Sequence, residues 1–242
     1  MKLAPYGRIF FGVSAVLFGV IALLWHDADT WQNVATIWKL PFGAIVGDVL
    51  MVALIIGGIG IMFARTARGA AIVLAVVYVV YSLTSIPGIV AAPKEYAQWG
   101  NFFEFFALVC GAIAVYTVAS ANVSRAAGLR RLARLGLGVC AISFTLGQIV
   151  YFRFTASLVP VWIPPNQMFW TILTTIAFAL AAIAILINRQ ARLATQLMTL
   201  MLVLFGVLVW IPRLVAHPAT HFTWSEFALT FLIAGAAWVV GE

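Results

Sequence analysis

Charged side chains are scarce in this sequence. Only 9% of the 242 residues are Asp, Glu, Lys or Arg, whereas 64% are hydrophobic, and the mean hydropathy is +1.10. A soluble domain of this size needs a charged, hydrated surface, so this composition excludes a soluble fold. Apolar runs long enough to cross a bilayer recur along the whole chain. The sequence therefore predicts an all-α, polytopic integral membrane protein.

Cysteines and the signatures of common enzyme sites are also few. Cys110 and Cys140 are the two cysteines, and they lie within apolar runs without C-x-x-C spacing, which argues against a zinc site or a paired redox motif. No G-x-S-x-G, H-E-x-x-H, P-loop or dinucleotide-binding pattern lies on a suitable element. Fourteen Lys and Arg against seven Asp and Glu give a net charge of +7, but no basic run is interleaved with stacking aromatics in a polar segment. Nucleic acid is therefore not expected as a partner, whereas anionic membrane lipids are.

The apolar runs divide into eight predicted membrane helices, in preference to seven. Each is close to the roughly 20 residues that a hydrocarbon layer of about 30 Å requires. The first run imitates a signal peptide but lacks an A-x-A site and is followed by further spans, so we interpret it as a membrane helix. Prolines predict a surface loop in the first third of 154–188, and 26–42 could form a short amphipathic surface helix. The predicted spans are 8–25, 43–64, 69–91, 101–121, 132–152, 167–188, 193–214 and 224–240.

The basic residues predict the orientation of these spans. Most of them fall at the N-terminus or in the even-numbered turns, and the positive-inside rule places those segments in the cytoplasm. Both termini are therefore expected to be cytoplasmic. The residues on this predicted inner side are Lys2, Arg8, Arg65, Arg68, Arg125, Arg130, Arg131, Arg134, Arg189 and Arg192, and those on the outer side are Lys39, Lys94, Arg153 and Arg213.

The two halves of the chain resemble each other, with an offset of about 122 to 126 positions. Each half holds four predicted helices, an even number, so both halves would enter the membrane in the same orientation. We therefore expect two parallel four-helix repeats, residues 1–124 and 125–242, related by a pseudo-twofold axis along the membrane normal. The recurring residues are Arg8, Gly12, Val13, Ala15 and Phe18 with Arg134, Gly138, Val139, Ala141 and Phe144; Arg65, Ala67 and Arg68 with Arg189, Ala191 and Arg192; and Ile86, Pro87, Val90, Ala91, Pro93 and Trp99 with Ile211, Pro212, Val215, Ala216, Pro218 and Trp224.

The second half resembles the DoxX-like four-helix membrane module, and the first half resembles it less closely. The residues that carry the resemblance are Leu158-Val159-Pro160-Val161-Trp162-Ile163-Pro164-Pro165, Phe169-Trp170, Arg189 to Arg192, Trp210-Ile211-Pro212-Arg213 and the helix from Trp224 to Ala237. A glutamate that such modules commonly carry ahead of a Gly-Gly pair is replaced by Leu54 here. The resemblance implies a protein of the bacterial cytoplasmic (inner) membrane, in some cases an accessory subunit of a quinone-linked oxidoreductase. A quinone is thus the implied cofactor and a redox protein the implied partner.

Ionisable residues inside membrane helices are costly, at about 2.5–3.5 kcal/mol each, and so mark candidate sites. Asp48 lies inside the second predicted helix, and Glu104 and Glu226 open the fourth and eighth at what we take to be corresponding places. Arg153 and Arg213 end the fifth and seventh. We hypothesise that these arginines pair with the acids around an outward-opening polar cavity. The alternative is that the arginines extend from helix ends to the lipid headgroups.

Histidines and tryptophans near the predicted outer face complete the candidate ligand site. His217 and His221 are four residues apart, but Pro218 between them argues against a helical pair of ligands, and no metal site is predicted. Trp99 and Trp224 belong to a set of tryptophans concentrated at the outer ends, which fits either an aromatic cavity or an interfacial belt.

Three functions are compatible with these patterns, and no catalytic residue is assigned. The first is a non-catalytic membrane subunit that holds a quinone or a redox partner. The second is a small carrier or binding protein for an amphipathic solute, as parallel repeats and proline-interrupted helices suggest. The third is a membrane enzyme that uses Asp48, Glu104 or Glu226 as a general acid on a lipid-like substrate.

Overall fold

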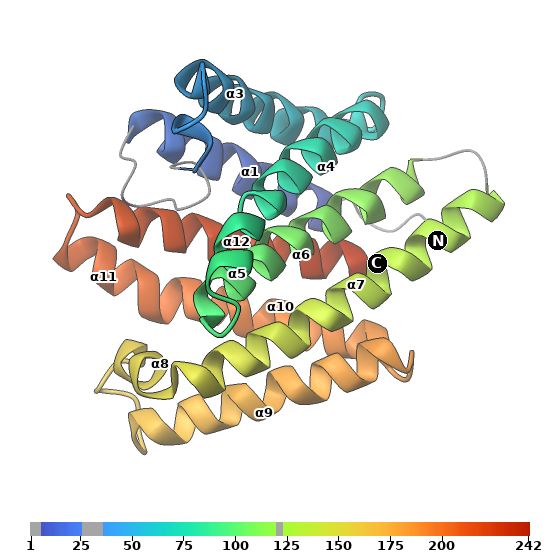
Figure 1. Cartoon of the computed structure of the whole chain (residues 1–242). Coiled ribbons are helices and arrows are strands. Elements are labelled where there is room, and N and C mark those ends of the chain that lie inside the picture. Colours follow the sequence, from blue (N-terminus) through green and yellow to red (C-terminus); the bar gives the residue numbers. More distant parts are fainter. Residues whose placement is uncertain (1–5, 26–35, 120–122) are drawn as a thin grey trace.

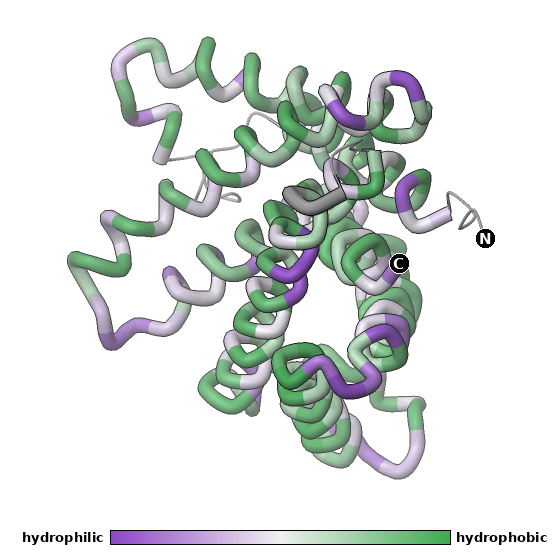
Figure 2. Tube along the Cα trace, turned by 90° about the vertical axis from the view of Figure 1, so that its right-hand side faces the viewer, coloured by the Kyte–Doolittle hydropathy of each residue, from purple (hydrophilic) through white to green (hydrophobic). Residues whose placement is uncertain are grey.

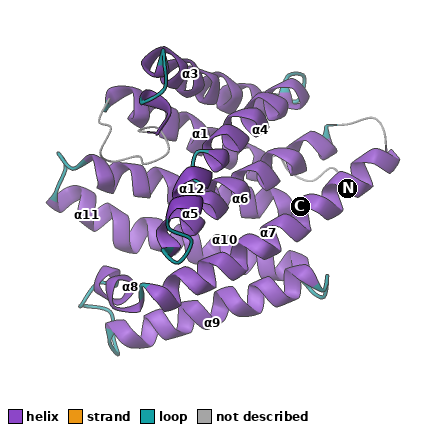
Figure 3. Ribbon diagram, in the orientation of Figure 1, coloured by secondary structure: helices purple, strands orange, loops and turns teal. Residues whose placement is uncertain are grey.

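The computed structural model describes residues 6–25, 36–119 and 123–242, with the side chains of 123–125 left aside. Within these ranges the chain is helical and contains no strand (Figure 3). The helices are α1 (Tyr6–Leu24), α3 (Gly43–Met62), α4 (Ala67–Leu83), α5 (Ile86–Ala91), α6 (Tyr96–Val118), α7 (Val123–Val150), α8 (Phe152–Leu158), α9 (Gln167–Leu186), α10 (Ala191–Phe205), the π-helix η1 (Gly206–Trp210), α11 (Ile211–Ala216) and α12 (His221–Gly241).

Eight of the described helical segments are long and apolar enough to cross a membrane. They are α1, α3, α4 with α5, α6, α7, α9, α10 with η1 and α11, and α12. Hydrophobic residues cover these helices, and several of the turns are hydrophilic (Figure 2). The prediction of an all-α protein with eight such helices is confirmed.

The boundaries differ most from the predicted ones at three places. α7 begins at Val123 rather than near 132, because the intervening Arg, Leu and Ala residues favour a helix even outside an apolar layer. α6 begins at Tyr96 rather than 101. Residues 152–158, predicted in part as a surface loop, form α8, and the loop follows it until Asn166 caps α9 by accepting a hydrogen bond from the Phe169 amide (2.9 Å). Of the predicted surface helix 26–42, residues 26–35 lie outside the described ranges, and 36–38 form one helical turn.

The eight spans pack as a closed ring in chain order (Figure 1). α1 contacts α3, α3 contacts α4, and α4 contacts α6; α7, α9, α10 and α12 follow one another in the same way. Two further pairs, α6 with α7 and α12 with α1, join the two halves of the ring. α6 and α12 also contact each other across the centre, so that each belongs to both halves.

Small residues allow the helices at the centre to approach closely. A Cβ atom added to Gly111 of α6 would lie 2.7 Å from the Cβ atom of Ala236 in α12, and one added to Gly235 would lie 2.8 Å from the Cα atom of Phe11 in α1. Glycines of α3 also lie close to their neighbours, since Gly58 approaches the Gly12 carbonyl of α1 and Gly57 approaches Leu74 of α4. Close packing of helix backbones stabilises helix pairs in a membrane, because the hydrophobic effect does not drive helices together when lipid surrounds them.

Two kinds of hydrogen bond recur in both halves, and the second kind occurs a third time, from Trp170 to the Pro164 carbonyl (2.9 Å). Arg8 donates to the Met62 carbonyl at the end of α3 (3.4 Å), and Arg134 donates to the carbonyls of Ile185 and Leu186 at the end of α9. In α6, the indole nitrogen of Trp99 donates to the Pro93 carbonyl, six residues earlier (3.1 Å). In α12, the indole nitrogen of Trp224 donates to the Pro218 carbonyl at the same spacing (2.9 Å).

Candidate functional site

A pocket of about 870 Å³ opens inside the second half of the ring. Its walls are α7, α8, α9, α10, η1 and α12, together with the first turns of α6 from the first half. Most lining side chains are apolar, including Leu197, Met201, Phe205 and Ile233. This volume and lining are typical of small-molecule sites, which combine an apolar wall with few polar groups.

Two carboxyl groups face this pocket, Glu104 from α6 and Glu226 from α12. They lie close enough for the charge of Glu226 to act on Glu104. Neither carboxyl group forms a hydrogen bond or an ion pair with any residue in the described ranges, and the pocket wall contains no Lys, Arg or His. Both side chains are half-buried, and within the described ranges they join no neighbouring helices.

The other polar groups of the wall are mostly bonded to one another. The Tyr96 hydroxyl contacts both the backbone carbonyl and the side-chain oxygen of Ser143 (2.6 Å each), which joins α6 to α7. The Gln148 side-chain oxygen accepts hydrogen bonds from the hydroxyls of Thr174 (3.2 Å) and Thr175 (2.8 Å), which joins α7 to α9. These hydrogen bonds join neighbouring helices of the wall, whereas the side chains of Glu104 and Glu226 join no helices of the described chain.

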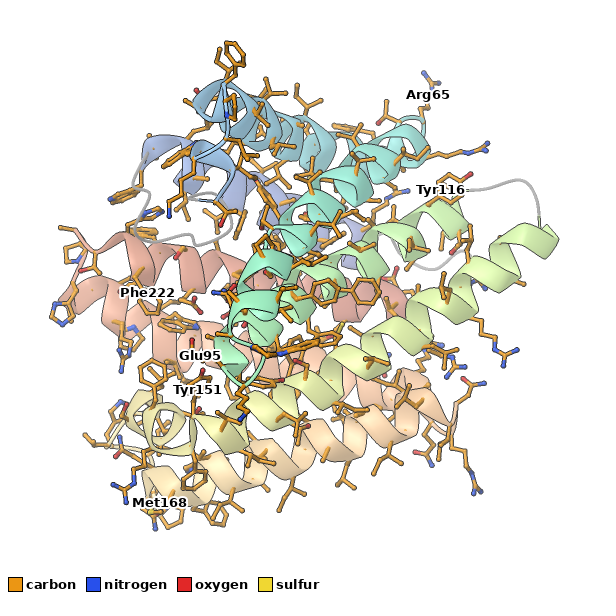
Figure 4. The ribbon with its side chains drawn as sticks, viewed as in Figure 1. Arg65, Glu95, Tyr116, Tyr151, Met168 and Phe222 are labelled. Atoms are coloured by element: carbon orange, nitrogen blue, oxygen red, sulfur yellow. The ribbon has the colours of Figure 1, made fainter. Side chains whose placement is uncertain are left out.

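Aromatic rings surround one end of the pocket. Tyr96 contacts Tyr151 (ring centroids 6.5 Å apart), and Trp210 contacts Phe222 edge to face (6.3 Å). Tyr151 and Phe222 lie at the same end of the bundle as Glu95, opposite the end that carries Arg65 and Tyr116 (Figure 4). The Trp210 indole donates to the Thr230 hydroxyl (2.9 Å), which fixes that ring against α12.

Aromatic side chains are buried inside the first half of the ring. Tyr78 and Tyr81 of α4 are fully buried there, in ring contact with Phe11 and Phe105 respectively. At the offset of 124 set by the Arg65 and Arg189 pair, Leu202 and Phe205 stand at the places of the two tyrosines, and both line the pocket. Two buried tyrosine rings thus lie on α4 in the first half, whereas Leu202 and Phe205 of α10 border the pocket.

The π-helix η1 is a second local difference between the halves. The segment from Arg189 to Ile211 is one residue longer than that from Arg65 to Ile86, and a π-helical turn accommodates one extra residue without breaking a helix. Its residues Leu208, Val209 and Trp210 line the pocket. The extra residue therefore lies in a segment that forms part of the pocket wall.

Of the predicted charged residues, Glu104 and Glu226 are brought together and the other three are not. Asp48 is half-buried on α3, which packs on α1 and α4, away from the pocket. Arg153 is exposed at the start of α8, and Arg213 donates to the Ser157 carbonyl (3.3 Å); neither lines the pocket.

Of the predicted aromatic and histidine residues, His221 and Trp224 form a cluster with Trp25 outside the pocket wall, and Trp99 and His217 do not join it. His221, buried at the first turn of α12, stacks on Trp25 (5.5 Å, 11° between planes), and Trp25 contacts Trp224 (6.2 Å). Trp99 makes its bond to Pro93, and His217 is exposed at the end of α11. The described ranges contain no group of three His, Cys, Asp or Glu residues placed to hold a metal ion.

Whether the two glutamates occupy corresponding places depends on how α6 and α12 are aligned. α6 begins at Tyr96 and α12 at His221, which fixes an offset of 125 between the two helices. Glu226 then corresponds to Asn101, and Glu104 corresponds to Leu229, about one helical turn away. Residues Asn101 and Leu229 also line the pocket, so equivalent faces of α6 and α12 meet there.

Sequence reasoning missed the polar residues Tyr96, Ser143, Gln148 and Thr174 of the wall. Their signal is weak but present, because each is a hydrogen-bonding side chain within an otherwise apolar helix. No protein-family model, curated protein or solved structure matches this chain.

Proposed function

We propose that this chain is a DoxX-like protein of the bacterial inner membrane that binds an amphipathic molecule in the pocket between α6 and the second half. The observation that carries the proposal is the pocket itself, with a largely apolar wall and two carboxyl groups that make no structural contact. Such a site suits a molecule with an apolar body and a polar head. A binding protein or small carrier is therefore the function that the geometry favours.

We also propose that the architecture arose by duplication, with units 1–124 and 125–242 in parallel and both termini in the cytoplasm. The packing order supports this, since exchanging the halves maps α1·α3 onto α7·α9, α4·α6 onto α10·α12, and α1·α12 onto α6·α7. The recurring Arg and Trp hydrogen bonds, Arg8 with Arg134 and Trp99 with Trp224, add further support. In this proposal, side chains pack the interior of the first unit, and the second unit contains most of the pocket.

A subunit that holds a quinone beside a redox partner is the second candidate. The rings of Tyr96, Tyr151 and Trp170 in the pocket wall favour it, because a quinone ring would stack on them. An enzyme acting on a lipid-like substrate would need one of the two glutamates as a general acid.

The test is to extract the protein together with its surrounding lipid, without detergent, and to identify bound small molecules by mass spectrometry. Ala177 lines the pocket from α9, so Ala177→Trp should fill part of the volume and release the bound molecule. Leu180, on the same helix, is 61% exposed on the outer surface, and Leu180→Trp is the matched control. Loss of the molecule in the first variant alone is the expected result. An identical molecular content in both variants and in the wild type would refute the proposed site, and a retained quinone would favour the redox subunit.

A further inference from the structure

The charges of the pocket wall indicate what kind of polar head the bound molecule carries. We propose that the pocket selects a lipophilic organic cation, such as an amine or a quaternary ammonium or phosphonium ion with an apolar body. This inference rests on the proposed function, since it specifies the ligand class of the same site.

Charge complementarity is the first argument. The wall presents the carboxyl groups of Glu104 and Glu226 and no basic side chain. The nearest candidate counter-ions from the sequence, Arg153 and Arg213, do not line the pocket, and Arg213 is engaged by the Ser157 carbonyl. An anionic ligand would find no positively charged partner there, whereas a cation would stabilise the ionised form of each carboxyl group.

The aromatic wall is the second argument. Tyr96, Tyr151, Trp170, Trp210 and Phe222 all line the pocket. The faces of such rings attract cations, and quaternary ammonium groups are recognised in this way. Two of the rings are held in place by their polar edges, because Trp170 donates to the Pro164 carbonyl (2.9 Å) and Trp210 donates to Thr230 (2.9 Å).

The depth of the pocket sets the size of the apolar body. Along α10 and η1 the lining residues run from Leu197 to Trp210. At 1.5 Å per residue this stretch is about 20 Å long. The part farthest from the aromatic end is lined by Leu197, Leu200 and Met201 on α10, with no charged group. A bulky aryl body or a long alkyl chain would fill this part while its cationic centre remains near the glutamates.

The experiment measures saturable binding to the full-length protein in lipid nanodiscs, with empty nanodiscs subtracted. Three probes of similar shape are compared: tetraphenylphosphonium (cation), tetraphenylborate (anion) and triphenylphosphine oxide (neutral). We expect the cation to bind at least tenfold more tightly than either of the other two, and Ala177→Trp to abolish its binding.

The variants Glu104→Gln and Glu226→Gln should each weaken binding of the cation severalfold, and the double variant at least tenfold. Glu95→Gln is the matched control, because Glu95 is exposed just before α6, does not line the pocket, and loses the same charge. Comparing the cation with the anion on the wild-type protein tests the cation preference even if the double variant does not fold.

The outcomes separate this inference from the proposed function. Equal binding of the three probes, or full binding by the folded double variant, would overturn the cation preference. If the neutral probe binds and Ala177→Trp abolishes that binding, the amphipathic site stands without the preference. If no probe binds above empty nanodiscs, the inference fails; if the lipid-extracted protein also carries no small molecule, the proposed function fails with it.

Discussion

Replacing Gly111 with alanine should weaken the crossing of α6 and α12 at the centre of the ring. The added Cβ atom would lie 2.7 Å from the Cβ atom and 2.8 Å from the Cα atom of Ala236, and 3.1 Å from the Cζ atom of Phe11. Carbon atoms pack best at about 3.5–4.0 Å, so α12 would have to move by about 1 Å. Overpacking of this kind costs about 1–3 kcal/mol, which exceeds the gain of about 1 kcal/mol that alanine offers in a helix.

Gly69 provides the control for this prediction. It lies in the first turn of α4, it is exposed, and an added Cβ atom would meet nothing within 4 Å. Gly69→Ala should therefore be neutral or stabilise the fold by about 0.5–1 kcal/mol. The assay is the free energy of unfolding in mixed micelles titrated with a denaturing detergent. If Gly111→Ala proves as stable as Gly69→Ala, the close approach of α6 and α12 is not what holds the two halves together.

Three further predictions concern other parts of the molecule. Arg134→Met removes the hydrogen bonds to the end of α9, and the same unfolding assay should show a loss of about 1–3 kcal/mol; an unchanged stability would contradict the contact. Deleting Val207 should convert η1 to regular α-helix and reduce probe binding at least tenfold while the protein still folds; undiminished binding would refute the role of the π-helix. Partial burial raises the pKa of Glu242, so the folded chain holds this proton more tightly than the unfolded chain, and stability should fall as pH rises from about 4.5. Glu242→Gln should flatten that dependence, and an equally steep profile would contradict it.

The eight spans could be predicted because the thickness of a bilayer sets the length of an apolar run. The residues near span ends were predicted less well. Tyr96 to Gly100 at the start of α6 and the arginines of α7 are not apolar enough to mark a span, yet they continue the helix. Hydropathy therefore locates the apolar part of a helix. The less apolar turns that extend the helix at its ends are seen only in the structure.

The candidate site was predicted in part, and the reason lies in the packing order. Hydropathy shows at what depth an acid lies but not which neighbouring helix it faces. Glu104 and Glu226 both face the pocket because α6 and α12 cross at the centre, whereas Asp48 lies on α3, which packs against α1 and α4 away from the pocket. The predicted partnership of the arginines with acids assumed that residues at similar depth lie close together. In the structure, Arg213 reaches a backbone carbonyl of α8 instead.

The position of α6 and α12 in the wall has a consequence for how the protein is made. α6 belongs by sequence to the first half, yet it supplies Glu104 to a pocket built mainly from the second, and α12 follows every other described helix in the chain. During synthesis the pocket can therefore close only after α12 has left the ribosome. Two fragments divided between α6 and α7 would each lack part of the pocket wall, and only their reassembly in one membrane would restore the pocket.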